Sequence, residues 1–337
     1  MPTEERALIR LSLPSKGRLA EDSFQLLEEC GLKIYKPNPR QYAATIPALP
    51  GLVVLFQRPG DIVSSVRDGS VDFGITGLDV VEEFKGPNQD ILILHEALQF
   101  GRCDLSLAVP ESLEGVQSML DLQVYASRLP SPLRVATKYP VLTTQFLNQY
   151  QIPHTLISAE GTLELAPTIG YADIISDLVS SGQTLRDNRL RPLPDGNILH
   201  SQAVLVANRK ALQENPQALQ VAHTLLEYIE AHLRAAGNLA IFANIRGESP
   251  EAIARLVSEK PTIRGLQGPT ISPILSQDPT TKWFAINIIV PRAELGQAIN
   301  ELRSIGGSGV VVMPVTYIFE EEPPRFKAML AALQPKA

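Results

Sequence analysis

Cysteine is scarce in this sequence, and long apolar runs are absent from it. Cys30 and Cys103 are the only two cysteines among 337 residues, too few for a disulfide framework and without the spacing of a structural zinc site. No stretch approaches the roughly 18 apolar residues of a membrane-spanning helix, and the first residues do not read as a secretory signal. We therefore expect a protein of a reducing compartment, the cytoplasm, with no membrane partner.

Positive charge is also in the minority. The sequence has 30 Lys plus Arg against 36 Asp plus Glu, which gives a formal net charge of −6 at pH 7. This balance repels a phosphate backbone, so we expect no nucleic-acid partner, although it leaves room for a local cationic pocket. The hydrophobic share of 44% and the charged share of 20% are typical of folded, water-soluble proteins, and the length suits two or three domains.

The first hundred residues alternate short apolar runs with helical segments, which is the pattern of an α/β domain. Strands are predicted at 9–14, 52–57 and 71–75, and helices at 19–30 and 61–68. Both helices end at a glycine, the usual residue after a helix C-terminus. These elements define a first lobe.

A second α/β lobe is predicted after residue 101. Its strands are expected at 103–109, 134–137 and 154–157, with a helix near 143–150. A further strand at 203–207 could rejoin the first lobe, and two crossings between lobes would create a hinged cleft of the kind that binds ligands. The predicted division is 1–101 plus about 195–230 for lobe I and 102–194 for lobe II.

The pattern changes after a long helix predicted at about 217–234. Two strand–helix–strand halves follow, which favours a ferredoxin-like or ACT-like domain at 231–319. The expected strands are 239–245, 268–275, 283–290 and 309–318, and the expected helices are 250–258, with Ser249 as N-cap, and 293–305. The acidic tail at 320–337 is predicted to be a solvated spacer before a short helical end, without a function.

The most informative chemistry lies between residues 160 and 185. Asp173 and Asp177 are four residues apart and share a face in either a helix or a strand, at about 6 Å or about 13 Å respectively. A turn of small and hydroxyl-bearing residues follows, as a phosphate monoester requires: Ser180, Ser181, Gly182, Gln183 and Thr184. The competing interpretation is an amphipathic helix with two surface carboxylates.

The run ELAPTIGYADIISDLVSSGQTL resembles the phosphoribosyl-pyrophosphate signature of the ATP phosphoribosyltransferases, the first enzymes of histidine biosynthesis. Other segments resemble this family in the family's own order: LPSKGRL at 13–19, RPGDIVSSVRDGSVDFGITGLD at 58–79, FGRCDLSLAVP at 100–110, RVATKYP at 134–140, GPTISPI at 268–274 and LRSIGGSGVVVMPV at 302–315. The resemblance covers nearly the whole chain, including the tail of the family's long form.

The resemblance implies an α/β fold with a two-lobed, periplasmic-binding-protein-like catalytic part and a C-terminal ferredoxin-like (ACT-like) regulatory domain. It implies that N1 of the ATP adenine attacks C1 of phosphoribosyl pyrophosphate, that Mg²⁺-bound pyrophosphate leaves, and that histidine inhibits. Such a reaction needs a held 5-phosphate, a positioned adenine and a stabilised oxocarbenium-like transition state, but no protein nucleophile. A homo-oligomer, from dimer to hexamer, is expected.

The resemblance also assigns residues. Phosphoribosyl pyrophosphate is expected at Glu164, Asp173, Asp177, Ser180, Ser181, Gly182, Gln183 and Thr184, with Asp173 and Asp177 as the catalytic carboxylates. ATP is expected at Lys16, Gly17, Arg18, Arg58, Asp72, Gly74, Thr76 and Gly77, and histidine at Thr270, Gly307 and Ser308. Mg²⁺ is expected to be held mainly by substrate. Each part of the ATP set has an alternative interpretation without a ligand. Residues 16–18 could be an exposed basic turn that caps the next helix, residues 72–77 a plain structural turn at the end of a strand, and Arg58 an ordinary surface arginine.

Two other classes of protein compete with the enzyme. A non-catalytic two-lobed module could bind a small anion or an effector, and a silent regulatory subunit of the histidine pathway would resemble histidyl-tRNA synthetases and lack the small-residue turn. The turn and the paired aspartates favour the enzyme. The histidines His95, His154, His200, His223 and His232 lack metal-ligand spacing and are interpreted as structural or surface residues, and Cys103 as a packing thiol.

Overall fold

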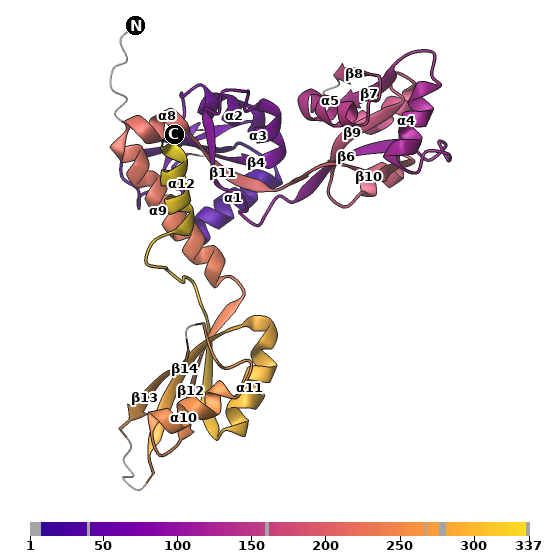
Figure 1. Ribbon diagram of the computed structural model, residues 1–337. Coiled ribbons are helices and arrows are strands. Elements are labelled where there is room, and N and C mark those ends of the chain that lie inside the picture. The colour runs from indigo at the N-terminus through magenta and orange to yellow at the C-terminus, as the bar shows by residue number, and fades with distance from the viewer. Residues whose placement is uncertain (1–7, 39–40, 159–161, 267, 276–280, 335–337) are drawn as a thin grey trace. The chain divides into compact units, whose positions relative to one another are not determined.

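The computed structural model describes residues 8–38, 41–158, 162–266, 268–275 and 281–334 (Figure 1). The chain divides into two compact units, residues 1–226 with 323–337 and residues 227–322. Within the described ranges, no helix is both long and apolar enough to cross a membrane.

Lobe I of the first unit is built on a six-stranded sheet of order β2-β3-β1-β4-β11-β5. Its strands are β1 (Ile9–Pro14), β2 (Ala43–Thr45), β3 (Leu52–Gln57), β4 (Phe73–Gly77), β5 (Ile91–His95) and β11 (Ala203–Asn208). Its helices include α1 (Arg18–Glu29), α2 (Pro59–Arg67), α3 (Leu78–Phe84) and α8 (Arg209–Glu214). β1 pairs in parallel with both β3 and β4, so the carboxyl ends of these three strands lie at one edge of the sheet.

Strand β11 joins lobe I from a distant part of the sequence. It is buried along its whole length and pairs antiparallel with both β4 and β5. The sheet therefore closes around a strand that follows the second lobe in the chain, and lobe I is discontinuous in sequence.

Lobe II is a five-stranded sheet of order β10-β6-β9-β7-β8. Its strands are β6 (Cys103–Pro110), β7 (Leu133–Thr137), β8 (His154–Ser158), β9 (Ile174–Val179) and β10 (Leu190–Ser201), and its helices are α4 (Met119–Ser127), α5 (Pro140–Gln149), α6 (Ala166–Ile169) and α7 (Gln183–Asp187). The interpretation of residues 172–179 as an amphipathic helix is wrong, because β9 is a strand between β6 and β7.

The boundary between the lobes falls later than the sequence predicted. Residue 194 was expected to end lobe II, but β10 pairs with β6 as far as the partners Ser201 and Cys103. Strand β10 passes through Pro194, Asp195 and Gly196 with an irregular register. The chain returns to lobe I after Ser201.

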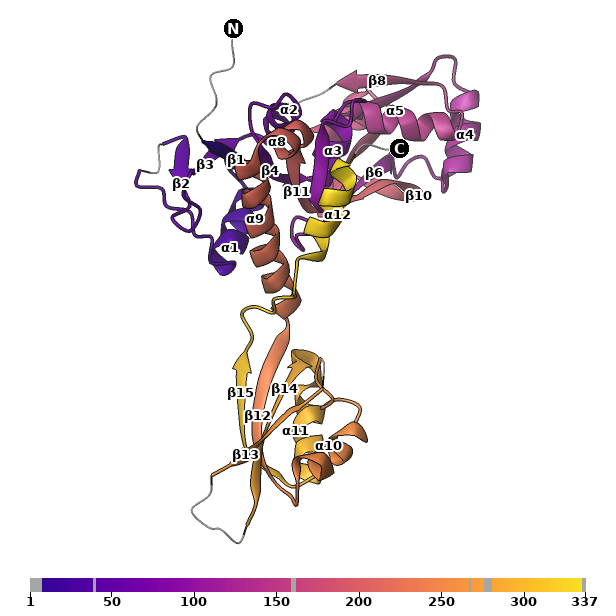
Figure 2. The same cartoon turned by 60° about the vertical axis from the view of Figure 1, so that its left-hand side comes forward.

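The second unit has the predicted strand–helix–strand repeat (Figure 2). Its strands β12 (Asn238–Arg246), β13 (Thr270–Ile274), β14 (Trp283–Pro291) and β15 (Gly307–Pro314) form an antiparallel sheet of order β13-β14-β12-β15, with helices α10 (Pro250–Ser258) and α11 (Leu295–Ser304) on one face. Ser249 caps α10 as predicted, since its hydroxyl accepts the Ala252 N–H at 3.2 Å. This order of strands and helices is ferredoxin-like.

The end of the chain belongs to the first unit. Helix α12 (Pro324–Leu333) follows the second unit but packs on β5 and α8 of lobe I, and it buries Phe326 and Met329. Arg209 of α8 donates to the Ala332 carbonyl at 2.6 Å, which satisfies one of the last carbonyls of α12. The predicted tail is therefore a spacer followed by a structural helix of lobe I.

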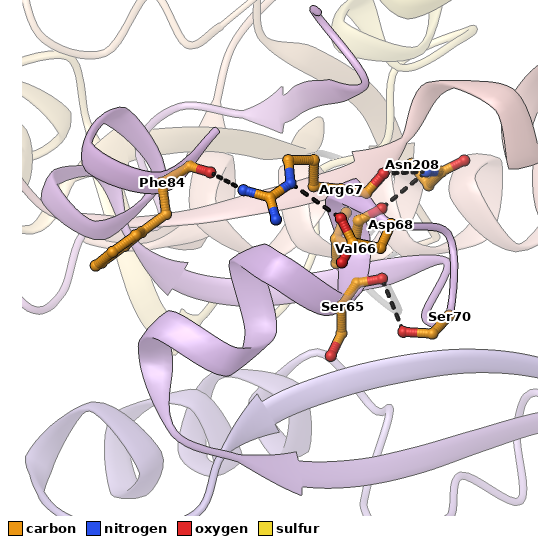
Figure 3. A network of polar contacts seen from close by, with 7 residues as sticks. All are labelled: Ser65, Val66, Arg67, Asp68, Ser70, Phe84 and Asn208. Carbon is orange, nitrogen blue, oxygen red and sulfur yellow. Dashed lines mark hydrogen bonds and ion pairs between the residues drawn. The ribbon is translucent and has the colours of Figure 1, made fainter. Parts of the chain in front are cut away.

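One side chain at the end of β11 joins three elements of lobe I, and Figure 3 shows its contact with the end of α2. Asn208 is 5% exposed, and its Nδ2 donates to the Val66 carbonyl at 2.8 Å, at the C-terminus of α2. Its Oδ1 accepts the Ala211 N–H at 2.8 Å and so caps α8. Nearby, Arg67 donates to the Phe84 carbonyl at 2.9 Å and ties α2 to the end of α3.

We predict that Asn208→Ala lowers the free energy of unfolding by roughly 1–3 kcal/mol, because it removes the cap of α8 and one donor to the Val66 carbonyl, which then keeps the Gly69 N–H at 3.2 Å. Denaturant unfolding measures the change. Asn208→Asp should also destabilise, since a carboxylate retains the cap of α8 but cannot donate to Val66. A change below about 0.5 kcal/mol in both variants would show that Asn208 does not hold β11 in place.

Candidate active site

The turn after β9 has the geometry of a small anion site. Gly182 has φ of +69°, a conformation in which a side chain is strained, and α7 begins at the next residue. A Cβ on Gly182 would stand 3.0 Å from Arg186 Nη1. Ser180, Ser181 and Thr184 are exposed. The turn borders a pocket of about 70 Å³, lined by Glu164, Asp177, Leu178, Val179, Ser180, Ser181, Gly182, Thr184 and Leu185.

Arg186 of α7 contacts this turn and was not among the predicted site residues. Its Nη2 donates to the Ser181 carbonyl at 3.1 Å and to Gln183 Oε1 at 3.0 Å. The guanidinium therefore stays next to Gly182 and adds a positive charge beside the exposed hydroxyls. An arginine within three residues of a Ser/Gly turn is the signal that could have identified it.

Asp177 lies in the last half of β9, next to this turn. Burial raises the pKa of its carboxyl, and the charge of Glu164 raises it further. The hydrogen bond that Oδ1 accepts from the Leu178 N–H at 2.8 Å and the charge of Lys138 lower the pKa. Lys138 follows the end of β7, within the RVATKYP segment, and was not among the predicted site residues. Asp177 is thus a carboxylate kept in a partly buried pocket without an ion-pair partner in contact among the residues described, which suits a group that meets a developing positive charge.

Asp173 lies at the other end of β9, away from the turn. Its Oδ2 accepts the Arg134 backbone N–H at 2.8 Å, and its Oδ1 accepts from Arg134 Nη2 at 2.7 Å. Partial burial works to raise the pKa of Asp173, but the hydrogen bonds and charge of Arg134 outweigh it and hold the pKa below its usual value. The carboxylate joins β7 to β9, about 13 Å along the strand from Asp177.

Lobe I repeats this Arg–Asp clasp. Asp72 lies just before β4 and accepts the Arg10 backbone N–H at 2.8 Å, while its own N–H donates to the Arg10 carbonyl at 3.1 Å. Arg10 Nη1 donates to the Ser70 carbonyl at 3.1 Å, as Arg134 Nη1 donates to the Gly170 carbonyl at 2.8 Å. The structure therefore places two predicted site residues, Asp72 and Asp173, at amino ends of strands, away from the loops at the carboxyl ends.

The remaining ATP residues gather mostly at the carboxyl ends of the lobe I strands. Lys16, Gly17 and Arg18 follow β1, and Arg58 follows β3; all four are exposed. Thr76 and Gly77 end β4, and Thr76 is four residues from Asp72 just as Asp177 is four residues from Asp173. These positions lie at the carboxyl ends of the parallel strands β1, β3 and β4, where cations can bind the phosphates of a nucleotide or of pyrophosphate.

The two glycines of β4 have packing roles. A Cβ on Gly74 would stand 2.5 Å from Ile62 of α2, so the strand and helix could not approach as they do. A Cβ on Gly77 would collide with Asp79 Oδ1. Close packing accounts for both residues, and their contact with ATP stays a prediction.

The three residues of the second unit that were predicted to bind free histidine do not lie together. Thr270 is on β13 and pairs with Asn287, whereas Gly307 and Ser308 are on β15. β13 and β15 are opposite edges of the sheet, three strand spacings or about 14 Å apart. One domain therefore cannot hold a single amino acid with all three residues.

His95 and Cys103 have structural environments. His95 is 2% exposed and accepts the Ala97 N–H at 3.2 Å, and burial lowers its pKa to about 4. Burial raises the pKa of the Cys103 thiol to about 11, with a smaller contribution from Asp79. Across the ranges that the structure describes, no three His, Cys, Asp or Glu side chains gather in a group that could hold a metal ion.

The fold is that of a two-lobed α/β protein in which a left-handed turn of small residues follows a central strand of the second lobe. A family model described as ATP phosphoribosyltransferase matches residues 58–231, and a second, described as HisG, C-terminal domain, matches residues 235–317. The chain therefore belongs to the ATP phosphoribosyltransferase family, and it carries that family's C-terminal domain.

Known relatives agree over most of the chain. ATP phosphoribosyltransferase 2, chloroplastic, of Arabidopsis thaliana is 48% identical over 335 residues, which cover 97% of this chain and 81% of that protein. ATP phosphoribosyltransferase of Methanococcus maripaludis is 32% identical over 311 residues, covering 92% and 100%. A chain of an ATP phosphoribosyl transferase (HisG:HisZ) complex from Thermotoga maritima superposes with a TM-score of 0.52 at 24% identity, over 66% of this chain and 99% of that chain, a likeness of fold alone.

We predict opposite effects on stability from Asp177→Asn and Asp173→Asn. A raised pKa means that folding disfavours the ionised Asp177, so Asp177→Asn should raise the melting temperature at pH 7, by less as the pH falls through the raised pKa. A lowered pKa means that folding favours the ionised Asp173, so Asp173→Asn should lower the melting temperature at pH 7, by less as the pH falls below the usual range of an aspartate.

Activity should separate the same two variants. Asp177→Asn should lower kcat about 100-fold, because it removes a charge that acts on the transition state, whereas folded Asp173→Asn should keep kcat within about threefold. Steady-state kinetics beside thermal melts measures both. Equal losses of kcat in the two variants would place Asp173 at the substrate and contradict the clasp as its role.

Proposed function

We propose that the transfer takes place at the pocket between Asp177 and the turn 180–184. The family's reaction, the first step of histidine biosynthesis, joins N1 of ATP to C1 of phosphoribosyl pyrophosphate and releases pyrophosphate. The observation that carries the proposal is the left-handed Gly182 turn beside a partly buried carboxylate. The small residues let the backbone approach the 5-phosphate, and the carboxylate lies one short segment away from it.

Each group has a distinct task in this proposal. The hydroxyls of the turn, its backbone N–H groups and Arg186 hold the 5-phosphate. The Asp177 carboxylate stabilises the positive character that grows at the ribose in the transition state. Lys16, Arg18 and Arg58 bind phosphates of ATP or the departing pyrophosphate. Asp72 and Asp173 hold strands and touch neither substrate.

The family uses a divalent metal, and we propose that it is Mg²⁺ held mainly by the substrate. Glu164 and Asp177 line one pocket, and carboxylate oxygens are the ligands that Mg²⁺ prefers. Two carboxylates leave most of the coordination to phosphate oxygens and water. When bound, the ion would neutralise charge on the leaving pyrophosphate.

We also propose that the second unit binds histidine and that the protein works as a homo-oligomer. Because Thr270 and Ser308 lie on opposite edges of one sheet, a ligand that touches both requires a second copy of the domain. Inhibition then requires histidine to favour one of two arrangements of the subunits or lobes. The cytoplasmic location stays a prediction, consistent with the free thiols of Cys30 and Cys103.

The turn can be tested with Gly182→Asp. A carboxylate there would strain a positive φ and repel a phosphate, so we expect the loss of transfer, with a fall in melting temperature no larger than that of a matched positive-φ control. The near-ultraviolet absorbance of the adenine reports N1 alkylation directly. Gly170→Asp is the matched control, because Gly170 also has a positive φ, of +91°, and open space around it, outside the turn. Near-normal activity of Gly182→Asp would refute the phosphate turn.

Histidine binding can be tested with Ser308→Leu and Thr270→Leu. If the site spans two copies, each variant should weaken inhibition at least tenfold while the uninhibited kcat stays unchanged, because neither residue is in the catalytic unit. Loss in Ser308→Leu alone would place histidine at the β15 edge. Calorimetry that detects no binding of histidine to the full-length protein would contradict the sensor role altogether.

A further inference from the structure

Two buried carboxylates of α3 lie outside the pocket described above. Asp79 and Glu83 are 4% and 5% exposed, and their spacing of four residues places them on one face of the helix. A buried carboxylate is costly unless it is hydrogen-bonded. Both accept hydrogen bonds, and the donors belong to lobe II.

Glu83 caps a helix of the other lobe. Helix α5 begins with Pro140, which has no N–H, and its own N-cap residue, Tyr139, makes no side-chain cap. Glu83 supplies the acceptors instead: the Val141 N–H donates to Oε1 at 2.8 Å, and the Leu142 N–H donates to Oε2 at 3.0 Å. The carboxylate also complements the positive end of the helix dipole.

Asp79 binds two further groups of lobe II. The Tyr139 hydroxyl donates to its Oδ2 and the Ser201 hydroxyl to its Oδ1, both at 2.6 Å, and the Asp79 N–H donates to Ser201 Oγ at 3.0 Å. Burial, together with the charge of Asp79, raises the pKa of Tyr139 far above its usual value, so the phenol remains a donor at physiological pH. Gly77 leaves the room that the carboxylate occupies.

A buried path leads from these contacts to the strand of Asp177. The Tyr139 N–H donates to Thr137 Oγ1 at 2.9 Å, at the end of β7. Thr143, on the same helix that Glu83 caps, donates from its hydroxyl to Ser176 Oγ at 2.8 Å. Ser176 is fully buried and directly precedes Asp177. The helix held by lobe I is therefore hydrogen-bonded to the strand that carries Asp177.

We propose that Glu83 and Asp79 are positioning residues for the transfer reaction. They hold α5 and Tyr139 so that Asp177, in lobe II, keeps one fixed geometry relative to the cationic turns of lobe I. Neither residue touches a substrate. The proposal rests on the placement of the transfer at Asp177. Because a misplacement of reacting groups by about 1 Å can cost about 100-fold in rate, the loss of these contacts should appear in kcat.

Glu83→Gln and Tyr139→Phe in the full-length protein test the proposal. A glutamine has one amide oxygen, so one of the two α5 N–H groups would face an NH₂ group. We expect kcat to fall about 10- to 100-fold in each variant, with KM for both substrates within about threefold of wild type. In Glu83→Gln the amides of Val141 and Leu142 should also exchange hydrogen faster. Glu82→Gln is the control, because Glu82 pairs with Lys85 and should leave kcat within about twofold.

Several outcomes would overturn the proposal. If both variants retain kcat within about twofold while the α5 amides exchange faster, the contacts are structural only. If the amides exchange as in wild type, Glu83 does not hold α5. Tyr139→Phe keeps the shape of the side chain and decides the question should Glu83→Gln not fold. A wrong placement of the transfer site would give a different result. In that case Gly182→Asp and Asp177→Asn would both be active, whatever the kcat of Glu83→Gln and Tyr139→Phe.

Discussion

The repeated Arg–Asp clasp is the interaction on which the catalytic unit depends. In each lobe an aspartate before a central strand accepts the backbone N–H of an arginine on the neighbouring parallel strand, with Asp72 and Arg10 in one lobe and Asp173 and Arg134 in the other. The clasp fixes the register of the two strands at their amino ends. The loops at the carboxyl ends are then free to keep backbone N–H groups and hydroxyls exposed for substrate.

The role of each carboxylate in the catalytic unit depends on its surroundings. Asp173 meets a guanidinium, and its ionised form is favoured, so it contributes to stability at neutral pH. Asp177 is partly buried with few donors, and its ionised form is disfavoured, which costs stability and leaves charge available for a substrate. Asp79 and Glu83 are more buried than either, and hydrogen bonds from the other lobe satisfy them. Residue type alone does not separate these roles.

The chain returns twice to lobe I after it has entered another part of the structure. β11 returns to lobe I after lobe II, and α12 returns to lobe I after the second unit. Each return adds buried contacts: Asn208 caps α8 at the end of β11, and α12 buries its own Phe326 and Met329. Lobe I is thus completed only with β11 and α12, which joins its stability to that of the parts inserted between its segments.

The sequence by itself determined the local elements and the chemistry of the turn. The apolar periodicity predicted most strands, the doubled strand–helix–strand repeat predicted the ferredoxin-like unit, and the run around Asp177 and Gly182 indicated a phosphate site. The tertiary structure decided which end of a strand each residue occupies. It separated Asp173 from the turn, carried β10 through Pro194 and Gly196, and placed Thr270 and Ser308 on opposite edges of a sheet. It also brought Glu83 to the start of α5, 58 residues away. Periodicity reports which face of an element is buried, whereas strand order and inter-lobe contacts depend on long-range pairing that no local pattern encodes.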